Sequence, residues 1–342
     1  MKNIRFLCAL SATLLLCACS LAAPAITPTL PAPSAPTPTQ TVNPTVIPAA
    51  TSTTAASPTP RPAVQRVVII SIDGLRPDGL LHSNIPRISV LINGGAVSYT
   101  AQTVFPSVTL PAHASMLSGR CVSKHGINWD DYEPDKGYLQ GPTVFSIAHD
   151  AGLWTVMVVG KEKLKTIARP GTVDTFRFVS GSDEEIVHAA LQEAAGGFGV
   201  LFVHLTFPDF IGHTQGWMSA AYLSVIGRDD TAVSTLLDGL KAGNLLEGTL
   251  IILTSDHGGH DQSHGSALPE DMTIPWIIFG PGIAESMPLE VPILTVDTAA
   301  TGVWALGLPV PVGWDGRPVV EAFGLTAQSA GVASAAPGRC GS

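Results

Sequence analysis

The sequence predicts an α/β fold with a doubly wound, mostly parallel sheet and helices on both of its faces. Two observations carry this prediction. Short, continuous runs of β-branched and other apolar residues recur along the chain, as is typical of strands buried on both faces. Segments with helical spacing of apolar residues lie between these runs, and strands that alternate with helices form parallel sheets. In such sheets, ligands bind beyond the carboxyl ends of the strands.

The candidate strands are the apolar runs at residues 67–72, 154–159, 200–205, 249–254 and 274–279. The candidate helices lie between or after these runs. Ser182 and Glu185 have the spacing of a capping box, which predicts that a helix begins there. Residues 220–241 and about 296–306 have the composition and apolar spacing of two further helices. We find no internal repeat.

The charge composition sets the N-terminal part apart from the rest. The chain has 342 residues, of which 45% are hydrophobic and only 13% charged, and its net charge is −9. No charged residue occurs between Arg5 and Arg61. The acidic balance, together with the lack of any run of five Lys or Arg, indicates no nucleic-acid-binding surface. The length is enough for one large domain or two ordinary ones.

The first residues resemble an export signal. Lys2 and Arg5 precede an apolar run at 6–16, which has the length of a signal-peptide core and is too short to span a bilayer. The L-C-A-C segment that follows resembles a bacterial lipobox. It predicts a signal peptide at 1–19 and a membrane-anchored lipoprotein with its lipid on Cys19. The alternative is an ordinary secretory signal, which would leave a secreted or periplasmic protein after cleavage at Ala22, Ala23 or Ala25.

Three further segments follow the signal. Residues 20–63 are rich in Pro and Thr and carry no apolar periodicity, so we expect an extended, disordered tether. Residues 64–327 contain all candidate strands and helices and form the expected globular domain. Residues 328–342 are small and polar, and we expect a loose C-terminal tail.

Two cysteines remain if the signal peptide is cleaved and Cys19 carries a lipid. In an oxidising compartment, Cys121 and Cys340 are expected either to form a disulfide that ties the tail to the domain or to remain two free thiols. Neither belongs to a Cys-x-x-Cys or Cys/His cluster, so the sequence does not support cysteine ligation of a metal.

Two polar segments near the first candidate strand carry potential site residues. Asp73 ends that strand, where it could begin a turn or serve a function. Thr109 lies between Pro106 and Pro111, at a place where a helix begins. A hydroxyl there would lie beside the free N–H groups of the helix start, which suit a phosphate. The alternative for Thr109 is an N-cap, which is the commoner use of Thr at a helix start.

Two further polar segments follow the third and fourth candidate strands. Asp209 and His213 are four residues apart and share a face if the segment is helical. The second segment, residues 255–265, contains Asp256 and three histidines among several glycines. Its histidines are His257, His260 and His264. A solvated polar loop is the alternative for this segment.

These residue types together favour a site with two metal ions. Mixed Asp and His ligation without Cys suits Zn²⁺, although Mn²⁺ or another divalent ion would also fit. Six or seven ligands are too many for one tetrahedral ion but suit two, and a pair of ions about 4 Å apart can hold the attacking and leaving oxygens of an in-line displacement. Thr109 would supply the nucleophile, because contact with a divalent cation lowers the pKa of its hydroxyl.

In this order the segments resemble the alkaline phosphatase superfamily, and within it the type I phosphodiesterase/nucleotide pyrophosphatase group. The resemblance covers about residues 65–325 and is most specific from Thr109 to Gly126 and at S-D-H-G from Ser255. It implies an alkaline phosphatase-like core. It also implies one zinc ion bound by Asp209, His213 and His264, and another bound by Asp73, Thr109, Asp256 and His257. His260 is the alternative to His264.

One position departs from the pattern of the group. The phosphodiesterases that the chain resembles place an Asn just beyond the His-Gly pair, where its amide would donate to a phosphate oxygen. That position here is Asp130, whereas Asn128 lies two residues earlier. An ionised Asp cannot donate a hydrogen bond. Either Asn128 takes the substrate-binding role, or Asp130 is protonated or paired, or the substrate differs.

The sequence thus predicts an exported two-zinc hydrolase of small phosphorylated substrates. The resemblance implies attack by Thr109 on phosphorus and a covalent phosphothreonine intermediate, with a phosphodiester or nucleotide pyrophosphate as substrate. The alternatives are a phosphomonoesterase, a phosphonate or sulfate-ester hydrolase of the same fold, and a transferase of headgroups. An alternative of another class is a non-catalytic surface lipoprotein that binds a ligand.

Overall fold

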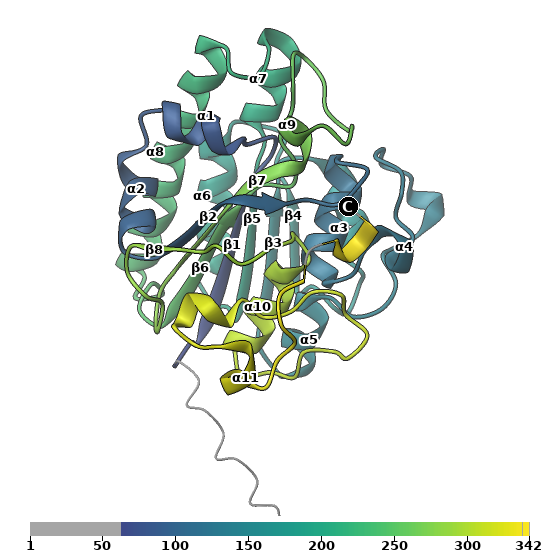
Figure 1. Ribbon diagram of the computed structural model, residues 1–342, viewed down its shortest axis with the longest axis vertical. Helices are drawn as coiled ribbons and strands as arrows, with labels where there is room; N and C mark the ends of the chain where they lie inside the picture. Colours follow the sequence, from purple (N-terminus) through teal and green to yellow (C-terminus); the bar gives the residue numbers. More distant parts are fainter. Residues whose placement is uncertain (1–62, 337, 342) are drawn as a thin grey trace, which may run out of the picture. The chain divides into compact units, whose positions relative to one another are not determined.

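A mixed sheet of eight strands organises residues 63–336 and 338–341, which this computed structural model describes (Figure 1). The predicted signal peptide, the Cys19 lipid site and residues 20–62 of the predicted tether lie outside the described residues. The strands are β1 (Arg66–Ile72), β2 (Ala96–Gln102), β3 (Thr155–Val159), β4 (Thr175–Phe178), β5 (Val200–Leu205), β6 (Thr249–Thr254), β7 (Thr273–Phe279) and β8 (Met287–Pro288). Their order in the sheet is β4-β3-β5-β1-β6-β7-β2-β8.

The predicted mostly parallel sheet is confirmed. The five strands β4, β3, β5, β1 and β6 pair in parallel, and β7 pairs antiparallel with both β6 and β2. All five predicted strands are present, and their bounds differ from the prediction by one residue at most. Four strands are wholly or almost wholly buried, namely β3 and the central strands β5, β1 and β6. Because both of their faces are covered, their sequences are continuous apolar runs.

Helices cover both faces of the sheet. They are α1 (Pro77–His82), α2 (Pro86–Asn93), α3 (Thr109–Ser118), α4 (Val122–His125), α5 (Val144–Asp150), α6 (Asp183–Ala194), α7 (Phe207–Gln215), α8 (Ala220–Ala242), α9 (Pro269–Met272), α10 (Asp297–Ala305) and α11 (Ala327–Ala330). Short 3-10 helices occur at Pro134–Lys136, Glu162–Ile167, Val320–Phe323 and Arg339–Gly341. The capping box of Ser182 and Glu185 begins α6 as predicted, and α8 and α10 are the other two predicted helices.

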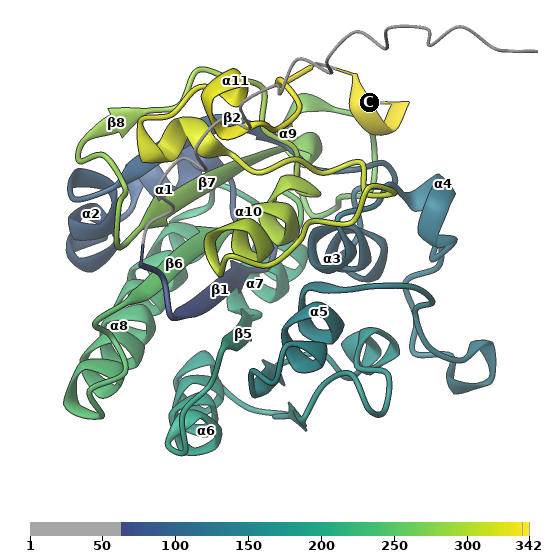
Figure 2. The ribbon, with the colours of Figure 1, turned by 90° about the horizontal axis from the view of Figure 1, so that it is seen from below.

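Two hydrophobic cores result from this arrangement. One face of the sheet packs against α3, α5 and α10, and the opposite face packs against α2, α6 and α8. Figure 2 shows these two sets of helices on opposite sides of the sheet. Successive residues of β1 alternate between the two cores, with Val67 in the first and Val68 in the second. The central strands are therefore rigid supports for whatever follows their carboxyl ends.

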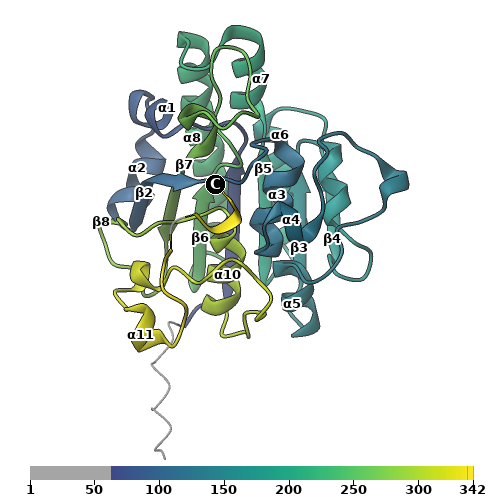
Figure 3. The same cartoon turned by 45° about the vertical axis from the view of Figure 1, so that its right-hand side comes forward.

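The chain after each central strand lies at one end of the sheet. Figures 1 and 3 show α7, which follows β5, at the upper end of the sheet, beyond the strands. Strand β1 lies between β5 and β6, and the last residue pairs, Ile72 with Leu205 and Ser71 with Thr254, place the three carboxyl ends level with each other. This edge is where a doubly wound fold binds its ligands.

The C-terminal residues are joined to the domain at two points. Cys121 and Cys340 form a disulfide, so the structure contains the first of the two predicted alternatives for this pair. Arg339 donates to both carboxylate oxygens of Asp297, each at 2.7 Å. The end of segment 328–342, for which we expected a loose tail, is therefore attached. Among residues 63–336 and 338–341, no helix has both the length and the hydropathy needed to cross a bilayer.

Candidate active site

Polar side chains from four segments meet at the carboxyl edge of the sheet. Asp73 directly follows β1, Asp209 and His213 lie one turn apart on α7 after β5, and Asp256 and His257 follow β6. His264 comes from the loop after His257. Thr109 is the first residue of α3. All seven residues predicted as metal ligands are thus brought to one place.

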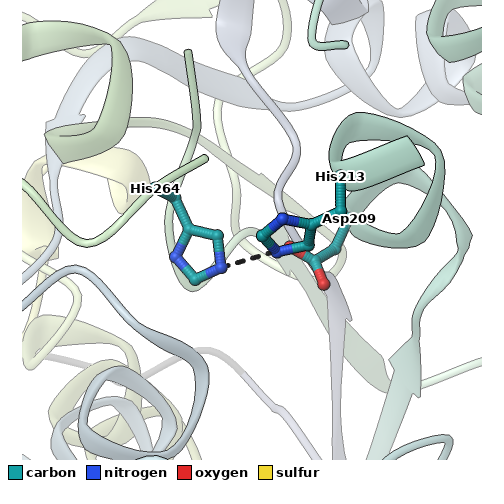
Figure 4. A group of neighbouring side chains, drawn as sticks. All are labelled: Asp209, His213 and His264. Carbon is teal, nitrogen blue, oxygen red and sulfur yellow. Dashed lines mark ion pairs between the residues drawn. The ribbon is translucent and has the colours of Figure 1, made fainter. Parts of the chain in front are cut away.

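Two groups of ligand atoms have the spacing of metal sites. One consists of Asp209, His213 and His264, and the other of Asp73, Asp209 and His257. In each group the ligand atoms lie within 4.8 Å of one another. Figure 4 shows the side chains of the first group directed toward one another. The Asp209 Oδ1 atom is 3.4 Å from Nε2 of His213 and 3.5 Å from Nε2 of His264.

The atoms that face these groups are unpartnered although they are buried. Within the described part of the chain, Asp73 Oδ1, Asp209 Oδ1, Asp256 Oδ2 and His257 Nε2 have no hydrogen-bond partner. The His257 Nε2 atom lies 3.4 Å from both Asp73 Oδ1 and Asp256 Oδ2. A buried carboxylate oxygen without a hydrogen-bond partner reduces the stability of the folded protein by on the order of several kcal/mol. Bound cations would remove this cost, so the residues fit metal ions.

His213, His257 and His264 all have their Nε2 atoms available to a metal ion, because their Nδ1 atoms face backbone carbonyls. Their Nδ1 atoms lie 3.0 Å from the Gln262 carbonyl (His213), 3.0 Å from the Ser107 carbonyl (His264) and 2.8 Å from the Gly258 carbonyl (His257). A carbonyl only accepts, so each Nδ1 carries the proton and each Nε2 has a free lone pair. This arrangement is the usual one for histidines that bind metals. Burial and the neighbouring His257 also lower the pKa of His264 to about 4, so its ring is neutral.

Thr109 is the first helical residue of α3 and not its N-cap. The cap is Val108, whose side chain makes no cap hydrogen bond. The Thr109 side chain is buried, and its Oγ1 atom accepts from Lys161 Nζ at 3.2 Å. On the next turn, His113 Nδ1 donates to the Thr109 carbonyl at 2.8 Å. The capping alternative for Thr109 is therefore wrong, and its hydroxyl contacts Lys161, which also contacts Asp73 and Asp209.

Sequence reasoning missed Lys161, which lies just after β3. Its Nζ atom is 2.7 Å from Asp73 Oδ2 and 2.7 Å from Asp209 Oδ2. Burial by itself would raise the pKa of Asp73, but Lys161 and a hydrogen bond from His204 hold it well below its usual range. Burial would likewise lower the pKa of Lys161, but the two carboxylates raise it. The sequence K-E-K-L-K at 161–165 has the composition of a solvated surface, so it carried no signal of a buried cation.

Asp256 differs from its neighbour Asp73. Burial and the proximity of Asp73 raise the pKa of Asp256 to about 7. Its Oδ1 atom accepts from the Gly74 N–H at 3.2 Å, whereas its Oδ2 atom is one of the unpartnered atoms. The single positive charge of Lys161 thus stabilises some of the clustered carboxylates but not all of them. Lys161 is one cation among the three carboxyl groups of Asp73, Asp209 and Asp256, so at least one further positive charge is needed to balance them.

Asp130, the position that departs from the family pattern, is paired. Its Oδ1 atom accepts from the Leu110 N–H at 2.8 Å, and its Oδ2 atom lies 2.7 Å from Lys163 Nζ. Asn128 is exposed. Of the explanations that the sequence left open, pairing of Asp130 is the one that the structure contains. The carboxylate occupies the backbone N–H next to Thr109 and forms an ion pair with Lys163.

His260, the alternative ligand, lies apart from both groups. Its Nδ1 atom donates to Asp271 Oδ1 at 2.7 Å, and this hydrogen bond raises the pKa of His260. Sequence reasoning did not assign a role to His204 on β5. Its Nε2 atom lies 2.9 Å from Asp73 Oδ2, so it helps to hold that carboxylate in place.

A buried carboxyl pair positions α7, and with it Asp209. Asp183 accepts from the backbone N–H groups of Thr206 and Phe207, at 2.7 Å and 2.9 Å, where α7 begins. Asp229 of α8 is fully buried beside Asp183, at the wall of a cavity of about 310 Å³. Burial and Asp183 raise the pKa of Asp229 well above its usual value.

We expect this pair to make the domain less stable as the pH rises. A carboxyl group whose pKa is raised on folding contributes stability at low pH that is lost as the pH increases above its unfolded value of 3.8. Asp229→Asn keeps a neutral donor and should flatten the decline, with a gain on the order of 1–3 kcal/mol at pH 8. Urea unfolding at several pH values checks this. Asp238→Asn, on the exposed face of α8, is the control, and parallel curves for the wild type and Asp229→Asn would contradict the prediction.

The comparisons with known proteins agree with this geometry. A family model described as type I phosphodiesterase/nucleotide pyrophosphatase matches residues 67–270. The chain is 30% identical over 216 residues to human ectonucleotide pyrophosphatase/phosphodiesterase family member 1, a match that covers 56% of this chain and 23% of the human protein. The chain spans about a quarter of the length of the curated relatives it matches first.

Solved structures support the fold. Murine ectonucleotide pyrophosphatase/phosphodiesterase 5, in complex with AMP, has a TM-score of 0.64 at 17% identity, and the match covers 75% of this chain and 98% of that chain. A phosphonate monoester hydrolase from Silicibacter pomeroyi has a TM-score of 0.61 at 15% identity, with 76% of this chain and 77% of that chain covered. At these identities the likeness shows the fold alone.

Proposed function

Because the chain belongs to the type I phosphodiesterase/nucleotide pyrophosphatase family, we propose that it hydrolyses phosphoric esters with two zinc ions and Thr109 as the nucleophile. The observation that carries this proposal is the set of buried, unpartnered carboxylate and imidazole atoms at the carboxyl edge of the sheet, where Lys161 contacts Asp73, Asp209 and the Thr109 hydroxyl. One ion would be held by Asp209, His213 and His264, and the other by Asp73, Thr109, Asp256 and His257. Such ions supply positive charge that makes the Thr hydroxyl more acidic and stabilises the charge on phosphate.

The protein's own residues prepare Thr109 for attack on phosphorus. Its Oγ1 atom forms the new P–O bond and gives its proton to water, while the leaving oxygen departs with the electron pair of the broken P–O bond and takes a proton from water. Water then cleaves the phosphothreonine and restores the hydroxyl. His113 supports this geometry because it connects α3 to strand β1. Its Nδ1 atom donates to the Thr109 carbonyl, and its Nε2 atom lies 2.8 Å from the Oγ atom of Ser71.

A phosphodiester or nucleotide pyrophosphate is the substrate class that we favour. The nucleophile is Thr and not Ser, and the murine neighbour in the same fold holds AMP. A phosphonate or sulfate ester is the second candidate, because Asp130 cannot donate to a phosphate oxygen as the Asn of the phosphodiesterases would. A phosphomonoester remains a rival within the same fold.

We also propose that the protein is exported and anchored by a lipid on Cys19. The disulfide between Cys121 and Cys340 supports export, because disulfides persist in oxidising compartments outside the cytoplasm. The basic start, the apolar run and the lipobox-like segment support the anchor. The acidic net charge of −9 does not favour a nucleic-acid partner.

A panel of chromogenic esters tests the proposed activity. We expect the zinc-loaded protein to hydrolyse bis-p-nitrophenyl phosphate faster than p-nitrophenyl phosphate, p-nitrophenyl phenylphosphonate and p-nitrophenyl sulfate. Rates measured with zinc content known for each preparation give the ranking, and the Thr109→Ala protein purified in parallel corrects for contaminating phosphatases. If the protein binds zinc and turns over none of the four esters, a binding protein without catalysis is the better explanation.

A further inference from the structure

Lys161 makes three close polar contacts inside the site, two of which are hydrogen bonds and one of which is an ion pair. An ammonium group has three donors, and the three neighbours of Lys161 Nζ are Asp73 Oδ2 at 2.7 Å, Asp209 Oδ2 at 2.7 Å and Thr109 Oγ1 at 3.2 Å. Asp73 and Asp209 belong to different metal groups in the proposed assignment. Lys161 therefore joins both halves of the site to the nucleophile.

The two oxygens of each carboxylate that contacts Lys161 have different surroundings. In Asp73 and Asp209, the Oδ2 atom faces Lys161 and the Oδ1 atom is turned inward without a partner. Lys161 hydrogen-bonds to neither of these Oδ1 atoms. It contacts the outer oxygens and leaves the inner oxygens free, so that Lys161 and bound ions could be present together.

Asp130 gives Lys161 a further role. The carboxylate of Asp130 is bound by the Leu110 N–H and by Lys163, so it offers no donor to a phosphoryl oxygen. Lys161 is the cationic donor that reaches the Thr109 oxygen itself. Its contact with that oxygen places its charge where negative charge would sit after the Thr109 hydroxyl loses its proton, and again when water releases the phosphoryl group from Thr109.

We propose that Lys161 is a catalytic residue of this site, which donates to the nucleophilic oxygen of Thr109 and holds Asp73 and Asp209 by one oxygen each, so that the other oxygen of each is left for a metal ion. This inference rests on the proposed hydrolase function. It assigns part of the charge stabilisation to the chain itself. It also predicts that the metal-free and metal-loaded proteins respond differently to loss of Lys161.

The Lys161→Met variant tests this proposal, with Lys165→Met as the matched control on the 3-10 helix Glu162–Ile167, of which Lys161 is the N-cap. We expect Lys161→Met to bind the wild-type amount of zinc at saturation but to lose activity by roughly 10²–10³-fold in kcat. Lys161→Arg should recover part of this loss, because it keeps the charge but not the geometry. Lys165→Met should keep wild-type kcat.

Thermal unfolding supplies a readout that does not depend on activity. In the metal-free protein, Lys161→Met leaves two buried carboxylates without their cation, and the midpoint should fall by about 5 °C or more. Zinc should raise the midpoint of Lys161→Met by more than it raises that of the wild type, since it replaces the missing charge. Lys165→Met should match the wild type in both states.

The outcomes separate the two proposals. If the wild type hydrolyses no ester of the panel, the proposed function fails, whatever the variants do. If the wild type is active and zinc-loaded Lys161→Met keeps its kcat within about threefold of the wild type, the role of Lys161 is wrong. If Lys161→Met loses zinc and a higher zinc concentration restores full kcat, Lys161 only holds the carboxylates, and its contact with the nucleophile has no catalytic effect.

Discussion

Replacement of Thr109 by alanine should reduce kcat for every ester that the protein hydrolyses by on the order of 10⁴-fold or more, because the atom that would attack phosphorus is removed. The fold should not change. The cap of α3 is Val108, and the Thr109 side chain makes no capping hydrogen bond, so the helix does not need this hydroxyl. Zinc should still bind to the carboxylate and imidazole ligands.

Two variants sharpen this experiment. Thr109→Ser keeps a hydroxyl at the same place and should retain most of the activity that alanine abolishes. Thr231→Ala, which removes an exposed hydroxyl on α8, should leave kcat unchanged. Mass spectrometry of acid-quenched wild type should find an esterified phosphoryl group on the peptide that contains Thr109. Full turnover by zinc-loaded Thr109→Ala would mean that water attacks phosphorus directly and that Thr109 is not the nucleophile.

The sequence predicted the central sheet well, because its buried strands carry a strong signal. Strands β5, β1 and β6 are covered on both faces and have no reason to alternate between apolar and polar residues. The strands that were not predicted lie toward the edges. β2 alternates buried and exposed residues, β4 has four partly exposed residues, and β8 has only two. Their place in the sheet depends on tertiary pairing, which a local pattern does not contain.

The candidate site was predictable to the extent that its chemistry is encoded in short segments. Asp209 and His213 could be paired from their spacing alone, as could Asp256 and His257 from their place after a strand. Lys161 could not, because its role depends on the way β3 brings it beside residues that are far away in the sequence. His204 and Asp183 have the same property, since each contacts a polar group in another element.

His264→Ala should remove one of two zinc ions per chain and reduce kcat by on the order of 10³-fold or more, whereas His260→Ala should keep both ions and most of the activity. The reason is geometric. The Nε2 atom of His264 lies 3.5 Å from Asp209 Oδ1, and its Nδ1 atom is held by the Ser107 carbonyl. Its ring stacks on that of His257, with the centroids 3.8 Å apart.

His260 is a matched control because it lies in the same loop and has its own buried partner. Its Nδ1 atom donates to Asp271 Oδ1 at 2.7 Å, and His260 belongs to neither of the two groups of ligand atoms. Elemental analysis of both variants after exhaustive dialysis, together with kcat, checks the prediction. Removal of all metal by a chelator should abolish wild-type activity, and added zinc should restore it. A loss of zinc in His260→Ala but not in His264→Ala would reverse the assignment, because the ion next to Asp209 would then require a rearranged loop that brings His260 into the site.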